Sequence, residues 1–178
     1  MVHFLHRHLP HVRLDVVERE RLIIDLARRY FLLPAADTLH LFRQDAVAFL
    51  ETPDACGYQV ALVDIFTPGA MAAPVFEPAF HRALLDRLDA DGVLAVNLWS
   101  GDRPSFDRAL AALEEASGGQ LLQMQVSRRS NVIVLAFPVA IPRAAIKRAR
   151  KNGPLHQRRY QLEFPRYLKR RRRSNRLP

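Results

Sequence analysis

The alternation of short apolar runs with segments of helical periodicity is the feature that most constrains the fold of this chain. Four apolar runs are expected to form strands, and they cover residues 12–18, 38–45, 58–66 and 92–99. The segments between them carry apolar residues at three- and four-residue spacing, which is typical of amphipathic helices. This alternation of strand and helix predicts an open α/β sheet with helices on both faces.

The apolar stripes locate the expected helices and the end of the sheet. The three stripes are Leu22, Ile23, Leu26 and Tyr30, then Phe80, Leu84 and Leu88, then Phe106, Leu110 and Leu113. Residues 92–99 are almost continuously apolar, as in a parallel strand buried on both faces. Residues 120–127 and 131–138 flank a short polar turn, which predicts a closing antiparallel pair. The sequence therefore predicts a nucleotide-binding class of α/β fold.

Three of the expected strands end at a carboxylate. Glu18 and Asp64 directly follow an apolar run, and Asp45 ends the second such segment, residues 38–45. In open α/β sheets, ligands bind beyond the carboxyl ends of the strands. We therefore expect the three acids on the ligand-binding side of the sheet. The alternative for each acid is that it caps the next helix or stabilises a turn.

Positive charge is concentrated at one end of the chain. Residues 143–178 hold 14 of the 27 lysines and arginines but only one of the 18 acids, Glu163. We expect a folded domain over residues 1–139 and a basic, partly helical tail over residues 140–178. Tyr160, Phe164 and Tyr167 of the tail fit one helix face that docks on the domain, interrupted at Pro165.

The alternative role for the tail is nucleic-acid binding, because arginines interleaved with aromatic residues can neutralise phosphates and stack bases. The basic run that would bind comprises Lys169, Arg170, Arg171, Arg172 and Arg173.

Other features limit the classes of protein. No apolar stretch approaches the ~18 residues of a membrane-spanning helix, and the amino-terminal segment does not resemble a secretion signal. We expect a cytoplasmic location and no metal. A single cysteine, Cys56, excludes an intramolecular disulfide. A metal site among the clustered histidines is the less favoured alternative to a solvated helix face, and those histidines are His3, His6, His8 and His11.

Four stretches in consistent order carry a family resemblance: DVVERERLIIDLARRYF, RQDAVAFL, YQVALVDIF and LDADGVLAVNLW. They resemble the spermidine synthase family of polyamine aminopropyltransferases. The resemblance covers roughly residues 4–137 and implies the Rossmann-like sheet of class I AdoMet-dependent methyltransferases, mostly parallel with a carboxyl-terminal antiparallel hairpin. It also implies a homodimer, with decarboxylated AdoMet as co-substrate and methylthioadenosine as product.

The resemblance assigns roles to individual residues. Glu18 matches the acid that holds the ribose hydroxyls, and a carboxylate can accept two such hydrogen bonds. Asp45, followed by Ala46, matches the acid of the motif that contacts adenine. Asp64 matches the acid that accepts a proton from the attacking amine, which needs a free lone pair to react.

The amine-binding segment departs from the family pattern. Thr67 stands where the family has a second acid, and His81 stands where it often has tyrosine. We assign Asp64, Thr67 and His81 to polyamine binding, with less negative charge than the family pattern supplies.

The family's first strand and glycine-rich loop would precede the segment HFLHRHLP. We therefore expect an amino-terminally truncated domain, and we hypothesise that Met1 is an internal methionine of a longer product, with transfer impaired by the truncation. A native amino terminus at Met1 in the source cell would exclude the longer product. A noncatalytic relative that binds anions through its tail is the alternative, and an AdoMet-dependent methyltransferase is a lesser one.

Overall fold

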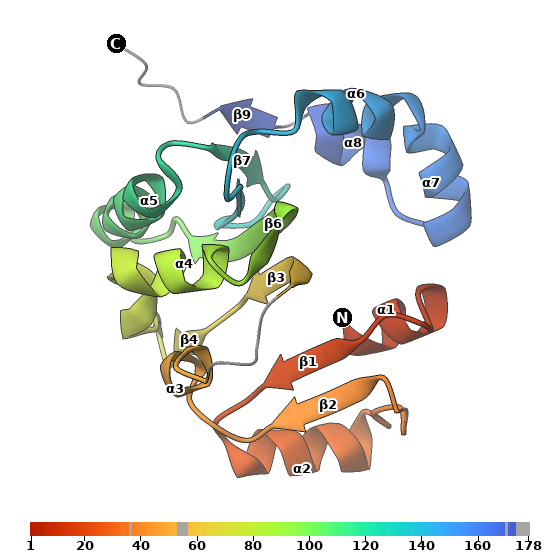
Figure 1. Ribbon diagram of the computed structural model, residues 1–178, viewed down its shortest axis with the longest axis vertical. Coiled ribbons are helices and arrows are strands. Elements are labelled where there is room, and N and C mark those ends of the chain that lie inside the picture. The colour runs from red at the N-terminus through yellow and green to blue at the C-terminus, as the bar shows by residue number, and fades with distance from the viewer. Residues whose placement is uncertain (36, 53–56, 170, 174–178) are drawn as a thin grey trace. The chain divides into compact units, whose positions relative to one another are not determined.

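The computed structural model describes residues 1–35, 37–52, 57–169 and 171–173. The chain divides into two compact units, residues 1–54 and 55–178. Each unit contains strands and helices of its own (Figure 1). Cys56 lies outside the described residues, and so does Arg170 of the basic run. None of the described helices is both long and apolar enough to cross a membrane.

The first unit is built on a two-stranded parallel sheet. Its elements are α1 (Val2–His8), β1 (Leu14–Val17), α2 (Arg21–Tyr30), β2 (Leu39–Phe42) and α3 (Ala46–Leu50). The strands pair in register from Leu14 opposite Leu39 to Val17 opposite Phe42. The helical connection between parallel strands is the βαβ unit that the alternation predicted.

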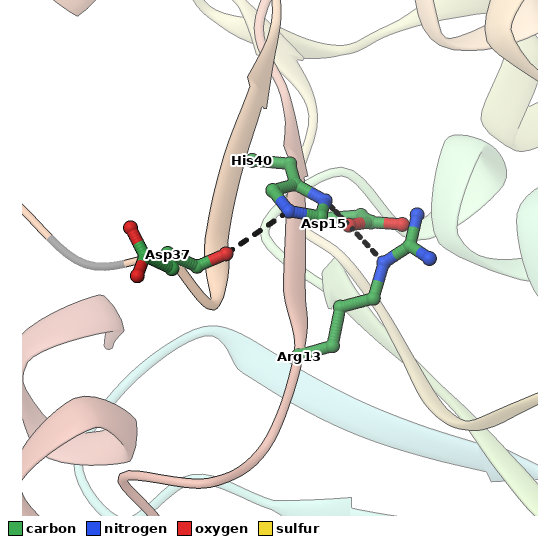
Figure 2. Close-up of polar contacts among 4 residues, drawn as sticks. All are labelled: Arg13, Asp15, Asp37 and His40. Atoms are coloured by element: carbon green, nitrogen blue, oxygen red, sulfur yellow. Dashed lines mark hydrogen bonds and ion pairs between the residues drawn. The ribbon is translucent and has the colours of Figure 1, made fainter.

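A polar cluster joins the two strands of this sheet (Figure 2). Asp15 and His40 are opposite each other in the register. His40 Nδ1 lies 3.0 Å from Asp15 Oδ1, and Arg13 Nε donates to the same oxygen at 2.9 Å. The Asp15 side chain is 3% exposed. Since His40 Nε2 also lies 3.2 Å from the Asp37 carbonyl oxygen, the imidazole links β1 to the turn before β2.

The second unit contains a five-stranded sheet of order β3-β6-β8-β7-β9. The strands are β3 (Tyr58–Val63), β6 (Leu88–Trp99), β7 (Leu121–Gln125), β8 (Asn131–Ala136) and β9 (Arg171–Arg173). β3 and β6 are parallel, and the β6–β8, β7–β8 and β7–β9 pairs are antiparallel. The predicted carboxyl-terminal hairpin, β7–β8, is therefore confirmed.

The core of the second unit lies between this sheet and two helices, α4 (Pro78–Leu85) and α5 (Arg103–Ser117). The completely buried apolar side chains come from alternate positions of β6 and β8 and from the inner stripe of α5. They include Leu94, Val96, Leu98, Leu113 and Val134. Period-two burial on the strands and helical spacing on α5 are what amphipathic elements require.

The loop after β3 folds into a small hairpin. β4 (Phe66–Thr67) pairs with β5 (Ala70–Met71) across a turn in which Gly69 has a φ of 83°. A positive φ of this kind suits glycine, which has no Cβ. Met71 is buried, and its sulfur accepts the Trp99 backbone N–H at 3.4 Å. The hairpin is thus held against β6, and η1 (Ala73–Phe76) leads into α4.

The basic tail folds into three short helices and a strand. The helices are α6 (Arg143–Lys151), α7 (Gly153–Tyr160) and α8 (Phe164–Lys169), which contact one another (Figure 1). The expected single helix is wrong, because α7 ends at Tyr160 and Gln161 has a left-handed φ of 55°. Pro165 lies in the first turn of α8, where proline is tolerated, so the break does not fall at this residue. The backbone of β9 pairs with β7, so residues 171–173 of the basic run form a strand.

Candidate active site

Glu18 and Asp45 lie at the carboxyl edge of the first unit's sheet. Glu18 follows β1, and its backbone N–H donates to the Phe42 carbonyl at the end of β2 at 3.0 Å. Asp45 comes three residues after Phe42, at the start of α3. Because parallel strands end at the same edge, the register brings the two acids to one side of this unit. Ala46 is the first residue of α3.

Backbone donors hold one oxygen of each acid. Glu18 Oε1 accepts the Glu20 N–H at 2.7 Å, and Asp45 Oδ1 accepts the Val47 N–H at 2.8 Å. The second bond caps α3, as the alternative interpretation of this acid expected. In the part of the chain that the structure describes, Glu18 Oε2 has no hydrogen-bond partner. That oxygen is available to a ligand.

Arg19 lies between the carboxylates of Asp45 and Glu20 at this edge, and its role was not predicted from the sequence. Its NH1 lies 3.8 Å from Asp45 Oδ2, and its Nε donates to Glu20 Oε1 at 3.1 Å. A guanidinium between two carboxylates lowers the local negative charge. Its position directly after Glu18 was a usable signal, because that residue also lies beyond the strand end.

Asp64 lies at the corresponding position in the second unit, directly after β3. Val63 is opposite Val96 in the parallel register, so Asp64 is next to Asn97. Asn97 Nδ2 donates to Asp64 Oδ1 at 2.8 Å. The carboxylate is otherwise exposed to solvent. The structure therefore places an accessible, oriented carboxylate at the end of a parallel strand.

Thr67 and His81 have different environments. Thr67 is exposed in β4, and its hydroxyl donates to the Ala70 carbonyl at 3.4 Å. His81 is completely buried in α4, with Nε2 2.8 Å from the Val75 carbonyl oxygen. Burial lowers the pKa of His81, and the bond to Val75 only partly opposes this effect. His81 thus borders η1 as a neutral imidazole, and its contact with a substrate remains a prediction.

The clustered histidines form part of a helix and a turn. His3 Nε2 hydrogen-bonds to the Phe31 carbonyl oxygen, and the His8 ring packs on Phe4 at a centroid separation of 4.6 Å. Within the described ranges, no group of three or more His, Cys, Asp or Glu residues could hold a metal ion.

Comparison with known proteins finds relatives of this chain in sequence and in structure. No family model matches the chain. The polyamine aminopropyltransferase of Neisseria meningitidis serogroup A is 26% identical over 162 residues, covering 90% of this chain and 61% of the relative. The Chromobacterium violaceum polyamine aminopropyltransferase is 24% identical over 177 residues, covering 97% and 66%. The chain thus spans less than two thirds of the length of these relatives.

Solved structures share the fold. Human methyltransferase-like protein 13 in complex with SAH superposes with a TM-score of 0.68 at 21% identity, covering 98% of this chain and 79% of that one. A probable spermidine synthase from Corynebacterium glutamicum has a TM-score of 0.64 at 21% identity, covering 74% and 50%. The predicted class I AdoMet-methyltransferase-like α/β fold is confirmed.

Proposed function

Because the chain is a relative of the spermidine synthase family, we propose that it is a spermidine synthase-like transferase that moves an aminopropyl group from decarboxylated AdoMet to a polyamine acceptor. The observation that carries this proposal is the position of Asp64, an exposed carboxylate oriented by Asn97 at the end of a parallel strand. Glu18 and Asp45 are the proposed nucleoside-binding acids, and Asp64 is the proposed proton acceptor for the amine.

The proposed nucleoside site fits the chemistry of its donors and acceptors. Glu18 Oε2 accepts ribose hydroxyls while Oε1 stays fixed by the Glu20 N–H. Asp45 contacts the adenine amino group through Oδ2, since Oδ1 is engaged by the helix cap. Ala46 adds a small residue beside the ring. Arg19 keeps this edge from accumulating uncompensated negative charge.

The proposed reaction is a displacement at carbon. Asp64 takes a proton from the ammonium group of the acceptor, which frees the nitrogen lone pair for attack. A C–N bond forms at the methylene next to the sulfonium, the C–S bond breaks, and its electron pair stays on sulfur. The products are the extended polyamine and methylthioadenosine. Thr67 offers its hydroxyl to the amine, and His81 hydrogen-bonds to the Val75 carbonyl oxygen in η1.

Calorimetric titration with methylthioadenosine tests the nucleoside site without requiring turnover. We expect micromolar binding that is lost in Glu18→Gln and in Asp45→Asn. Asp25→Asn is the matched control, because Asp25 is an acid of the same unit that pairs with Arg21 on α2. A folded chain that does not bind methylthioadenosine contradicts the proposal.

An aminopropyl-transfer assay tests Asp64. With putrescine and decarboxylated AdoMet, Asp64→Asn should reduce kcat by about 10²-fold or more, because it removes the proton acceptor. The assay is repeated with AdoMet in place of decarboxylated AdoMet. Methyl transfer without aminopropyl transfer would assign the chain to the methyltransferases instead. Light scattering tests the homodimer, and fractionation of the source cell tests the cytoplasmic location.

The tail supports a second candidate function, the binding of nucleic acid. Residues 143–169 contain nine lysines and arginines, and the single acid, Glu163, pairs with Arg166 at 2.6 Å. The basic residues of α6 are all exposed, whereas Ala145, Ile146 and Ala149 on its other face are half-buried. This helix presents positive charge to solvent over its whole length.

The aromatic rings of the tail pack on one another. The rings of His156, Tyr160 and Phe164 pack together with centroid separations of 5.6 to 6.0 Å. They form the small core between α7 and α8. The second candidate is therefore a contact with phosphates, in which bases are not stacked on these rings.

Fluorescence anisotropy with a labelled RNA tests this candidate. We expect affinity to fall steeply with salt, since each neutralised phosphate releases counterions. Deletion of residues 169–176 should abolish or strongly weaken this binding, and charge reversal at Lys147, Arg148 and Lys151 should lower the salt slope further. Binding that is independent of salt, or the absence of binding at low salt, contradicts it.

A further inference from the structure

Three side chains, two on the adjacent strands β8 and β6 and one directly after β3, form a hydrogen-bonded row. Asn131 at the start of β8 donates from Nδ2 to Asn97 Oδ1 at 3.1 Å. Asn97 on β6 donates from Nδ2 to Asp64 Oδ1 at 2.8 Å. The sheet order β3-β6-β8 makes these strands neighbours. The row therefore ends at the carboxylate that the proposed function assigns to the amine.

The row has one direction. An amide group has a donating nitrogen and an accepting oxygen, and the network decides which way it faces. The carboxylate of Asp64 requires the Asn97 nitrogen on its side. The Asn97 oxygen then faces β8, where the Asn131 nitrogen meets it. Each amide thus orients the next group, and Asp64 Oδ1 is the final acceptor.

Asn97 is a polar residue in the otherwise apolar run of residues 92–99. It lies between Val96 and Leu98, both completely buried on the opposite face of β6. Asp64 is exposed, so water could hydrate its carboxylate without a protein donor. A fixed donor at this point therefore does more than satisfy a buried acceptor. It restricts rotation of the carboxylate and leaves Oδ2 for a ligand.

We propose that Asn97 is a positioning residue that holds the Asp64 carboxylate so that Oδ2 faces the acceptor amine, and that Asn131 sets the orientation of Asn97. The proposal rests on the proposed function, in which Asp64 is the proton acceptor. A displacement reaction is sensitive to such positioning, because a misplacement of about 1 Å can cost about a hundredfold in rate.

Two variants separate positioning from stability. Asn97→Leu replaces the amide by an apolar group of similar size in an apolar strand, and Asn131→Leu leaves Asn97 without its orienting donor. Ser100→Ala is the matched control. It removes a hydroxyl that donates to the Ser130 carbonyl at 3.1 Å, between the same two strands, with no contact to Asp64.

The first measurement follows the Asp64 conformation directly. Three-bond couplings in NMR report the χ1 rotamer of Asp64 in the wild-type chain and in each variant. We expect one rotamer in the wild type and in Ser100→Ala, and rotamer averaging in Asn97→Leu. Unchanged couplings in Asn97→Leu, with a folded spectrum, overturn the proposal. This readout does not depend on turnover.

The second measurement is kinetic. In Asn97→Leu, kcat should fall about 10- to 100-fold, whereas the methylthioadenosine affinity should stay within about twofold, since no nucleoside-binding group changes. The Asn131→Leu effect should be smaller, and the double variant should equal Asn97→Leu, because residues in one network are not additive. Additive losses overturn the proposal.

Failure of the proposed function has a different signature. It would leave aminopropyl transfer absent in the wild type while the Asp64 rotamer still depends on Asn97. Failure of the positioning role would leave transfer intact and the rotamer indifferent to Asn97.

Discussion

The two units of the chain differ in how their apolar side chains are buried. In the second unit, the inner face of the sheet and α5 exclude water completely, and Leu94 is 0% exposed. In the first unit, the most buried apolar side chains are Ile24, Phe49 and Leu50, at 8 to 9% exposure. Leu22 of α2 is 67% exposed, and Phe31 after that helix is 70% exposed.

This difference indicates different sources of stability. The second unit is stabilised by close packing, in which each buried methylene counts. The first unit relies more on its polar groups: the Asp15–His40 pair across the sheet and the Asp45 cap of α3. Apolar substitutions should therefore be costly in the second unit, and polar ones should matter more in the first.

The largest contrast is expected from one chemical change made in both units. Leu94→Ala should reduce the free energy of unfolding of the second unit by about 3 to 5 kcal/mol, because it leaves a cavity. Leu22→Ala should change the stability of the first unit by less than about 0.5 kcal/mol, because the side chain is exposed. Urea denaturation monitored by Trp99 fluorescence measures the stability of the second unit, and hydrogen exchange of the α2 amides measures that of the first unit. Equal costs would remove the distinction between the units.

The next effect is expected at the polar cluster of the first unit. Asp15→Asn should cost about 1 to 3 kcal/mol, since it leaves charged and polar partners without the buried carboxylate. Hydrogen exchange of the β1 and β2 amides reports the loss. Asp25→Asn, an exposed acid on α2, should cost less than about 0.5 kcal/mol. A cost for Asp25→Asn as large as that for Asp15→Asn would show that burial of the pair does not matter.

Asp45 allows its structural and binding roles to be separated. Asp45→Ala should destabilise the first unit by about 1 kcal/mol through loss of the helix cap. Asp45→Ser keeps a capping oxygen and removes the charge, so stability should be retained while methylthioadenosine binding is lost. The two variants are compared by calorimetry and by amide exchange in α3. If Asp45→Ser binds methylthioadenosine with wild-type affinity, Asp45 only caps α3 and does not bind the nucleoside.

At neutral pH the smallest effect is expected at His81. Burial lowers its pKa in the folded state below the unfolded value of about 6.5. The unfolded chain therefore takes up a proton first on acidification, and stability is present above about pH 6.5 and is lost as pH falls through the folded pKa. Thermal unfolding from pH 7.5 to 5 should show this loss in the second unit. His81→Gln, which keeps a donor for Val75, should flatten it, and an unchanged acid limb would assign the loss to other groups.

The core of the fold could be predicted because burial and periodicity agree there. β3, β6, α4 and α5 follow from apolar patterns that pack against one another. The first part of β6, residues 88–91, could not be predicted as strand, because these residues are mostly polar or small. Their pairing depends on β3, where Gln59 Nε2 donates to Asp89 Oδ2 at 2.6 Å. A contact between segments 30 residues apart does not appear as a periodic pattern of apolar residues in the sequence.

The candidate site shows the same limit. The positions of Glu18, Asp45 and Asp64 after strands follow from the sequence, since each acid comes at the end of an expected strand. Asn97 and Arg19 were missed because their roles depend on which atoms they meet. A polar residue inside the apolar run 92–99 was nevertheless a visible signal. The predicted boundary between a domain at 1–139 and a tail at 140–178 remains a prediction, and β9 ties part of that tail to the sheet.

The placement of β9 has a consequence for how the protein behaves in concentrated solution. An edge strand exposes backbone groups that can pair with another molecule, and charged residues on that edge discourage such pairing. β9 places three consecutive arginines, 171–173, at one edge of the five-stranded sheet. The opposite edge, β3, presents Val60 and Leu62 at 51% and 46% exposure. Repulsion between like charges on two molecules therefore disfavours intermolecular strand pairing at β9, whereas the apolar side chains of β3 supply no such repulsion.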